Sequence, residues 1–108
     1  MQRVLISALL MLAVSAAQAA DVPQYKLVIA DHQFTPTELT VPAGVKFTLL
    51  VENHDSTPEE FESNDFNREK IIMPNGSITV FVGPLKAGKY RFFGDFHQDT
   101  AQGVLTAE

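Results

Sequence analysis

The sequence predicts an all-β protein, a Greek-key β-sandwich or small barrel of seven or eight short strands. Apolar and polar residues alternate over short runs, which is the pattern of half-buried strands. Turn-forming Pro, Gly, Asn and Asp residues interrupt these runs about every ten residues, a spacing typical of β-sandwiches and barrels. A helical period is not sustained anywhere beyond the N-terminal apolar run. These observations together exclude helical bundles and alternating α/β folds.

Three strands are predicted in the first half of the chain. The clearest of them carries Phe47, Leu49 and Val51 at alternate positions, so these side chains should share the face that meets the core. Pro36 interrupts the chain between the first two strands, and residues 42–44 form a turn after the second. The three predicted strands span residues 25–30, 38–41 and 46–52.

The second half begins with an acidic stretch, residues 53–67, which is predicted to be mostly loop around one short strand at Phe61. A turn follows at residues 73–76. The segment Gly88-Lys89-Tyr90 fits a tyrosine corner, in which the phenol hydroxyl bonds back to the chain. Phe34, Phe47 and Phe92 are expected in the core. The remaining predicted strands span residues 69–72, 77–82, 88–93 and 103–107.

Residues 1–19 are predicted to be an export signal. Arg3 precedes an apolar run over residues 4–14, which is too short to span a membrane, and Ala17-Gln18-Ala19 is an A-x-A cleavage signature. The remainder, residues 20–108, is long enough for one core but not for two domains. We therefore expect a single periplasmic domain without stable membrane insertion.

Composition narrows the classes of partner and chemistry. The chain has no cysteine, so disulfides cannot stabilise it and a thiolate-bound metal is excluded. Its formal net charge of −5 argues against nucleic acid as a partner. The three histidines lie in turns or at strand ends without a nucleophile motif beside them, so a hydrolase is not expected.

Several short motifs occur in an order that resembles a known family. They are His32-Gln33-Phe34-Thr35-Pro36, Val41-Pro42-Ala43-Gly44, Asn53-His54-Asp55, Glu59-Glu60-Phe61-Glu62-Ser63, Gly83-Pro84-Leu85, Gly88-Lys89-Tyr90 and the stretch from Phe93 to Gly103. This order resembles the cupredoxins, and more closely the cysteine-poor cupredoxin-like domains of EfeO-type periplasmic iron-uptake proteins and of small partners of iron permeases. The resemblance covers nearly all of the chain after the signal. It implies a cupredoxin-like Greek-key β-sandwich.

The resemblance also implies where a metal would lie, and here the sequence departs from the blue-copper pattern. A blue-copper site uses one His after the Asn-containing turn and Cys, His and Met from the last loop. In this chain the three loop positions fall on Gly94, His97 and Gln102, while Glu59 or Glu60 stands in place of the first His. Without a thiolate there can be no blue-copper centre.

A site with harder ligands is still predicted. Imidazole and carboxylate groups suit Cu(II), iron and zinc, and anionic oxygen donors favour the more highly charged oxidised ion. Glu60 and Glu62 share a parity along one strand and can point at one ion, whereas Glu59 has the opposite parity and is not expected to join them. The predicted metal ligands are His97, Glu60, Glu62, His32, Asp95 and Met73.

Each candidate also has an ordinary structural explanation. His97 can be a hydrogen-bonded loop residue, acidic loops are commonly just solvated, and His32 is ordinary at a strand end. Met73 offers a thioether to Cu(I) or fills a gap in the core. Asp95 is a ligand or a loop cap. His54, between two turn formers, is interpreted as a turn residue.

The resulting hypothesis is a periplasmic metal-binding protein, with copper as its cofactor and iron as substrate or alternative metal. It would assist ferrous iron oxidation or delivery to an iron permease or another periplasmic iron-uptake protein. The alternative is a metal-free sandwich that docks on such a partner through its acidic loop. A true oxidase would need an open coordination position as well as a metal, and turnover of Fe(II) with oxygen would distinguish it from a carrier.

Overall fold

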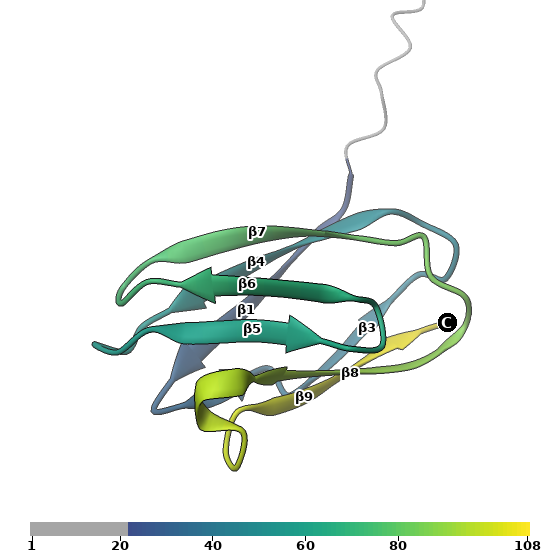
Figure 1. Ribbon diagram of the computed structural model, residues 1–108. Helices are drawn as coiled ribbons and strands as arrows, with labels where there is room; N and C mark the ends of the chain where they lie inside the picture. The colour runs from purple at the N-terminus through teal and green to yellow at the C-terminus, as the bar shows by residue number, and fades with distance from the viewer. Residues whose placement is uncertain (1–21) are drawn as a thin grey trace, which may run out of the picture.

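The computed structural model describes residues 22–108, which form two β-sheets packed face to face (Figure 1). The predicted export signal, residues 1–19, lies outside the described residues. Residues 22–108 contain no helical segment that could span a bilayer. The elements are β1 (Gln24–Ala30), β2 (Gln33–Thr35), β3 (Glu38–Val41), β4 (Phe47–Asn53), β5 (Glu59–Ser63), β6 (Arg68–Ile72), β7 (Ser77–Val82), β8 (Gly88–Gly94), the 3₁₀ turn η1 (Asp95–His97) and β9 (Gln102–Ala107).

One sheet has four strands in the order β2-β1-β4-β7, and the other has five in the order β3-β9-β8-β5-β6. Most neighbours are antiparallel, but β1 pairs with β4 and β3 pairs with β9 in parallel. The all-β sandwich predicted from the alternating pattern is therefore confirmed. The strand that the sequence pattern did not predict is β2, because its three residues are too few to show an alternation.

The core lies between the sheets and is rich in phenylalanine. Phe47, Phe61 and Phe92 are almost completely buried, and Phe34 meets the rings of Phe61 and Phe92 edge-on at centroid distances of 6.2 and 5.0 Å. Edge-to-face pairs of this kind are favoured by the ring quadrupoles. The core positions predicted for Phe34, Phe47 and Phe92 are confirmed, and this packing holds the strands that carry the candidate site.

The predicted tyrosine corner is also present. The hydroxyl of Tyr90, near the start of β8, donates a 2.8 Å hydrogen bond to the carbonyl oxygen of Lys86, four residues upstream. This bond fixes the chain as it enters β8. The same strand ends at Gly94, where η1 begins, next to the start of β5 (Figure 1). The candidate residues gather at this end of the sandwich.

Candidate metal centre

A tight turn between β1 and β2 presents His32. Both Asp31 and His32 have positive φ angles, of 51° and 56°, which cost non-glycine residues conformational energy. The carboxylate of Asp55 stabilises this turn, because its two oxygens accept the backbone N–H groups of Asp31 at 2.8 Å and His32 at 3.0 Å. Desolvation alone would raise the pKa of Asp55, but these backbone hydrogen bonds outweigh it and lower the pKa. His32 is thus held in place by its backbone.

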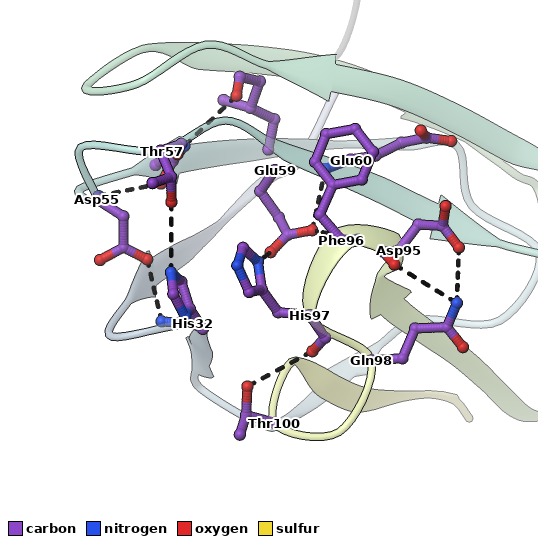
Figure 2. A network of polar contacts seen from close by, with 12 residues as sticks. His32, Asp55, Thr57, Glu59, Glu60, Asp95, Phe96, His97, Gln98 and Thr100 are labelled. Atoms are coloured by element: carbon purple, nitrogen blue, oxygen red, sulfur yellow. Dashed lines mark hydrogen bonds and ion pairs between the residues drawn. The ribbon is translucent and has the colours of Figure 1, made fainter.

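Glu59, the first residue of β5, lies at the centre of the site (Figure 2). Its side chain is only 2% exposed, and every polar contact it makes is with a donor. Oε1 accepts the backbone N–H groups of Phe96 at 2.9 Å and Glu60 at 3.1 Å, and Oε2 lies 2.6 Å from Nδ1 of His97. The carboxylate therefore links the start of β5 to the η1 turn.

Space for this carboxylate depends on Gly94, the last residue of β8. A Cβ atom at position 94 would lie 2.6 Å from Cδ of Glu59 and 2.8 Å from Cβ of Ala101, closer than real Cβ contacts come. The backbone N–H of Gly94 donates to the carbonyl of Ala101 at 2.9 Å, so the loop closes tightly over this point. The absence of a side chain at position 94 is what lets the Glu59 carboxylate sit inside.

The two site histidines stack rather than converge. The rings of His32 and His97 lie 3.5 Å apart between centroids with an interplanar angle of 12°. A metal ion binds imidazole in the plane of the ring, along the nitrogen lone pair, and the planes of these two rings are nearly parallel. In this arrangement the pair cannot chelate one ion. Nε2 of His32 instead lies 3.3 Å from Oγ1 of Thr57.

A group of candidate ligands is formed by carboxylates on the outer face of the five-stranded sheet. One oxygen each from Glu60, Glu62 and Asp95 lies within 4.8 Å of the others, a separation that a single ion can bridge. Glu60 and Glu62 project from the same side of β5, opposite to Phe61, and Asp95 begins η1. Asp95 is oriented by Gln98, whose Nε2 donates to its Oδ1 at 2.7 Å.

Mutual repulsion changes the acidity of these carboxyl groups. The pKa of Glu60 is raised to about 7, first by a hydrogen bond with Glu69 on β6, then by desolvation and by the charges of Glu69, Asp95 and Glu62. Desolvation, with the charges of Glu69 and Asp95, also raises the pKa of Glu62. Four carboxyl groups thus share a small area, which a cation would stabilise by removing the repulsion.

This raised pKa predicts a specific pH dependence of stability. The folded protein holds a proton on Glu60 up to about pH 7, whereas the unfolded chain releases it near the ordinary value of 4.5. The free energy of unfolding should therefore fall as pH rises from about 4.5 to about 7, because folding binds a proton over that window. Thermal unfolding of the metal-free protein across this range measures the effect.

Glu60→Gln should remove this part of the pH dependence and raise the melting temperature at pH 8, where the wild-type repulsion is fully developed. Glu38→Gln, which changes an exposed carboxylate on β3, should leave the profile as it is. A Glu60→Gln variant with the same slope between pH 4.5 and 7 as wild type would contradict the prediction.

The predicted ligand set therefore divides into two groups and an outlier. His97 does not meet Glu60 and Glu62 directly; it meets Glu59, because residues of opposite parity on β5 face opposite sides of the sheet. Met73 is 65% exposed, so it does not fill a gap in the core. Gln102 is also exposed, and its Nε2 donates to the carbonyl of Gln98. His54 is an exposed turn residue beside Glu52, as predicted.

The sequence interpretation left Glu59 out of the predicted ligand set, but the structure places it at the centre of the candidate site. The parity argument correctly separates it from Glu60 and Glu62, and it also places Glu59 on the buried side with Phe61. A glutamate with core parity is a signal in itself, because buried carboxylates are rare unless they are paired. That signal identifies a buried polar contact, although not its partner.

Comparison with known proteins identifies the family to which this chain belongs. The model of the Cupredoxin-like domain family matches residues 3–107, so the chain belongs to this family. The fold is shared with auracyanin A, described as a "blue" copper protein from Chloroflexus aurantiacus, at a TM-score of 0.68 and 17% identity over 79% of this chain and 98% of that one. At this identity the likeness establishes the fold alone.

Two sequence relatives are closer. An uncharacterized protein of Rickettsia prowazekii, RP394, is 52% identical over 85 residues, which are 79% of this chain and 68% of that protein. The iron uptake system component EfeO of Yersinia pseudotuberculosis is 47% identical over 47 residues, which are 44% of this chain but only 12% of that protein. The second relative shares a segment with this chain and is much longer.

The copper centre implied by the family does not fit the interior of this molecule. The positions that the resemblance assigns to Cys and Met carry Gly94 and an outward-facing Gln102, and neither offers a ligand to the interior. Glu59 already has a donor on each of its oxygens. A metal can be held here only by groups that reach the surface, namely the carboxylates of the outer face and the solvent-facing side of His97.

Proposed function

We propose that this protein is a periplasmic metal-binding member of the cupredoxin-like family that binds iron as cargo for a permease or another iron-uptake protein. The observation that carries the proposal is the convergence of Glu60, Glu62 and Asp95, whose ligand oxygens lie within 4.8 Å of one another. The similarity of part of the chain to an iron uptake system component supports the choice of metal.

The chemistry of the donor set favours iron at the carboxylates. Oxygen ligands suit hard cations, and anionic oxygens stabilise bound Fe(III) more strongly than bound Fe(II), because Fe(III) carries the larger positive charge. The elevated pKa of Glu60 means that iron must displace a proton, so affinity should rise from pH 6 to pH 8. Two of the three ligands project from a hydrogen-bonded strand, which keeps them in place before the ion arrives.

Copper fits a different position. His97 lies 27% exposed beside a surface depression that Asp95 also lines, and imidazole with carboxylate suits Cu(II). We propose His97 and Asp95 as the residues that would hold it. When bound, copper supplies a one-electron acceptor close to the iron-binding carboxylates.

Calorimetric titration of the metal-free protein tests the proposal, with Fe(II) under anaerobic conditions and separately with Cu(II). The informative variant is Glu60→Gln/Glu62→Gln/Asp95→Asn, which removes the three converging carboxylates. Its matched control, Glu38→Gln/Glu52→Gln/Glu108→Gln, removes the same charge elsewhere. We expect one-to-one Fe(II) binding that is lost in the first variant and kept in the control. Equal binding by both variants would show only diffuse attraction to an acidic protein.

The alternative function is docking without a metal. Three apolar side chains on β6, just after β6 and on η1 are exposed to solvent: Ile71 at 53%, Met73 at 65% and Phe96 at 45%. Ile71 is paired in register with Glu60, so apolar and acidic groups occupy one surface. Such a surface suits a partner with basic and apolar side chains. The absence of Fe(II) and Cu(II) binding in wild-type protein would favour this function.

A further inference from the structure

The orientation of the Glu59 side chain is fixed by the backbone. Two N–H groups, those of Glu60 and Phe96, donate to Oε1 from different elements, β5 and η1. Because both donors belong to the main chain, the atom at this position has to be an acceptor. The other oxygen, Oε2, then faces Nδ1 of His97.

This orientation determines which nitrogen of His97 is protonated. Oε2 lies 2.6 Å from Nδ1, and a carboxylate oxygen only accepts, so Nδ1 has to carry the proton. In neutral imidazole the other nitrogen, Nε2, is then left with a free lone pair. Stacking on His32 at 3.5 Å keeps the ring in this orientation.

The free nitrogen of His97 reaches solvent. Among residues 22–108, every fully buried side-chain nitrogen or oxygen has a hydrogen-bond partner. Nδ1 is the atom of His97 that makes a hydrogen bond to Glu59, and Nε2 makes none among the described residues, so Nε2 is not fully buried. An imidazole held by a carboxylate on one side and open on the other is the arrangement found for metal-binding histidines.

We propose that Glu59 is a positioning residue that fixes His97 in the Nδ1–H tautomer and so presents Nε2 as the ligand for a divalent cation such as Cu(II). The copper part of this inference rests on the proposed function, whereas the tautomer does not. Glu59 itself stays bonded to its three N–H donors and does not bind the metal. The buried Glu59 carboxylate occupies the interior of the site, so a metal ion can reach His97 only from the solvent side.

Glu59→Gln is a sharp test because the backbone donors determine which way the amide lies. The amide oxygen has to take the Oε1 position to accept from Glu60 and Phe96. The amide NH₂ then faces Nδ1 of His97, which becomes an acceptor, and the ring proton moves to Nε2. The substitution preserves the shape of the side chain but should reverse the tautomer and remove the lone pair from Nε2.

The measurement is the ¹⁵N spectrum of the histidine rings in metal-free protein, at a pH about two units above the ordinary histidine pKa of about 6.5. We expect the Nδ1–H form for His97 in wild type and the Nε2–H form in Glu59→Gln. The control is Glu52→Gln, at the exposed pair in which Glu52 contacts Nε2 of His54 at 3.0 Å, and it should leave the tautomer of His97 unchanged. Wild-type His97 in the Nε2–H form, or no change in Glu59→Gln, would overturn the proposal.

Copper affinity provides the functional readout. Cu(II) should bind Glu59→Gln about 10–100-fold more weakly than wild type, as for other substitutions of a carboxylate that holds a metal-binding histidine. Fe(II) binding at Glu60, Glu62 and Asp95 should not change. A reversed tautomer together with no Cu(II) binding by wild type would refute the proposed copper site and leave the positioning role intact. A reversed tautomer with unchanged Cu(II) affinity would overturn the assignment of Nε2 as ligand.

Discussion

Glu59→Ala should lower the free energy of unfolding by about 1–3 kcal/mol. The substitution removes the side-chain acceptor of the backbone N–H groups of Glu60 and Phe96, and both groups are partly buried, so each loss costs less than the roughly 1–3 kcal/mol of a fully buried unpaired donor. It also removes the contact that links β5 to His97. Chemical denaturation at pH 7 measures the loss.

Two further variants make this result specific to the buried carboxylate. Glu59→Gln keeps an acceptor for both backbone groups, so it should cost only about 0.5–1.5 kcal/mol. Glu62→Ala, three residues along the same strand and on its outer face, removes a carboxyl group whose pKa is raised by desolvation and by the charges of Glu69 and Asp95, and should not destabilise. Equal losses in Glu59→Ala and Glu62→Ala would contradict the role assigned to Glu59.

Phe92→Ala should be destabilising by about 3–5 kcal/mol, as is usual when a buried phenylalanine is truncated. Phe92 is 1% exposed, and its ring contacts those of Phe34 and Phe61 between the sheets. The ring also lies against Gly103 on β9, where an added Cβ atom would be only 2.2 Å from Cζ of Phe92. The same denaturation experiment measures the loss.

The contact between Phe92 and Gly103 allows a double-mutant test of this packing. Gly103→Ala alone should destabilise by about 1–3 kcal/mol, since the added methyl group overfills the core. In the Phe92→Ala background the methyl group has space, so the second substitution should cost little, and the two effects should not add. Additive losses would mean that the two residues do not share this space.

Much of the fold could be predicted because its strands are short and separated by strong turn formers. In β4, the alternate residues Phe47, Leu49 and Val51 all face the core as expected. The three-residue strand β2 could not be predicted, because it has only one inward residue, Phe34. Strand boundaries elsewhere agree to within two residues, since Pro and Gly residues mark them in the sequence.

The candidate site was harder to predict than the fold. Parity along β5 places Glu60 and Glu62 together, and the structure shows them close to Asp95. Parity cannot show that the η1 turn folds over the start of β5 and brings His97 to Glu59 instead. That contact needs the space that Gly94 leaves by having no side chain, and it needs the backbone N–H groups of Glu60 and Phe96. Only the folded chain brings these groups together.

Anomalous X-ray diffraction at the iron edge, from crystals of the protein equilibrated anaerobically with Fe(II), tests the proposal that Glu60, Glu62 and Asp95 together hold an iron ion. We predict one strong peak within ligand distance of oxygens from all three residues, absent from crystals of Glu60→Gln/Glu62→Gln/Asp95→Asn. An iron peak at another place, or no peak in wild-type crystals at saturating Fe(II), would contradict the claim.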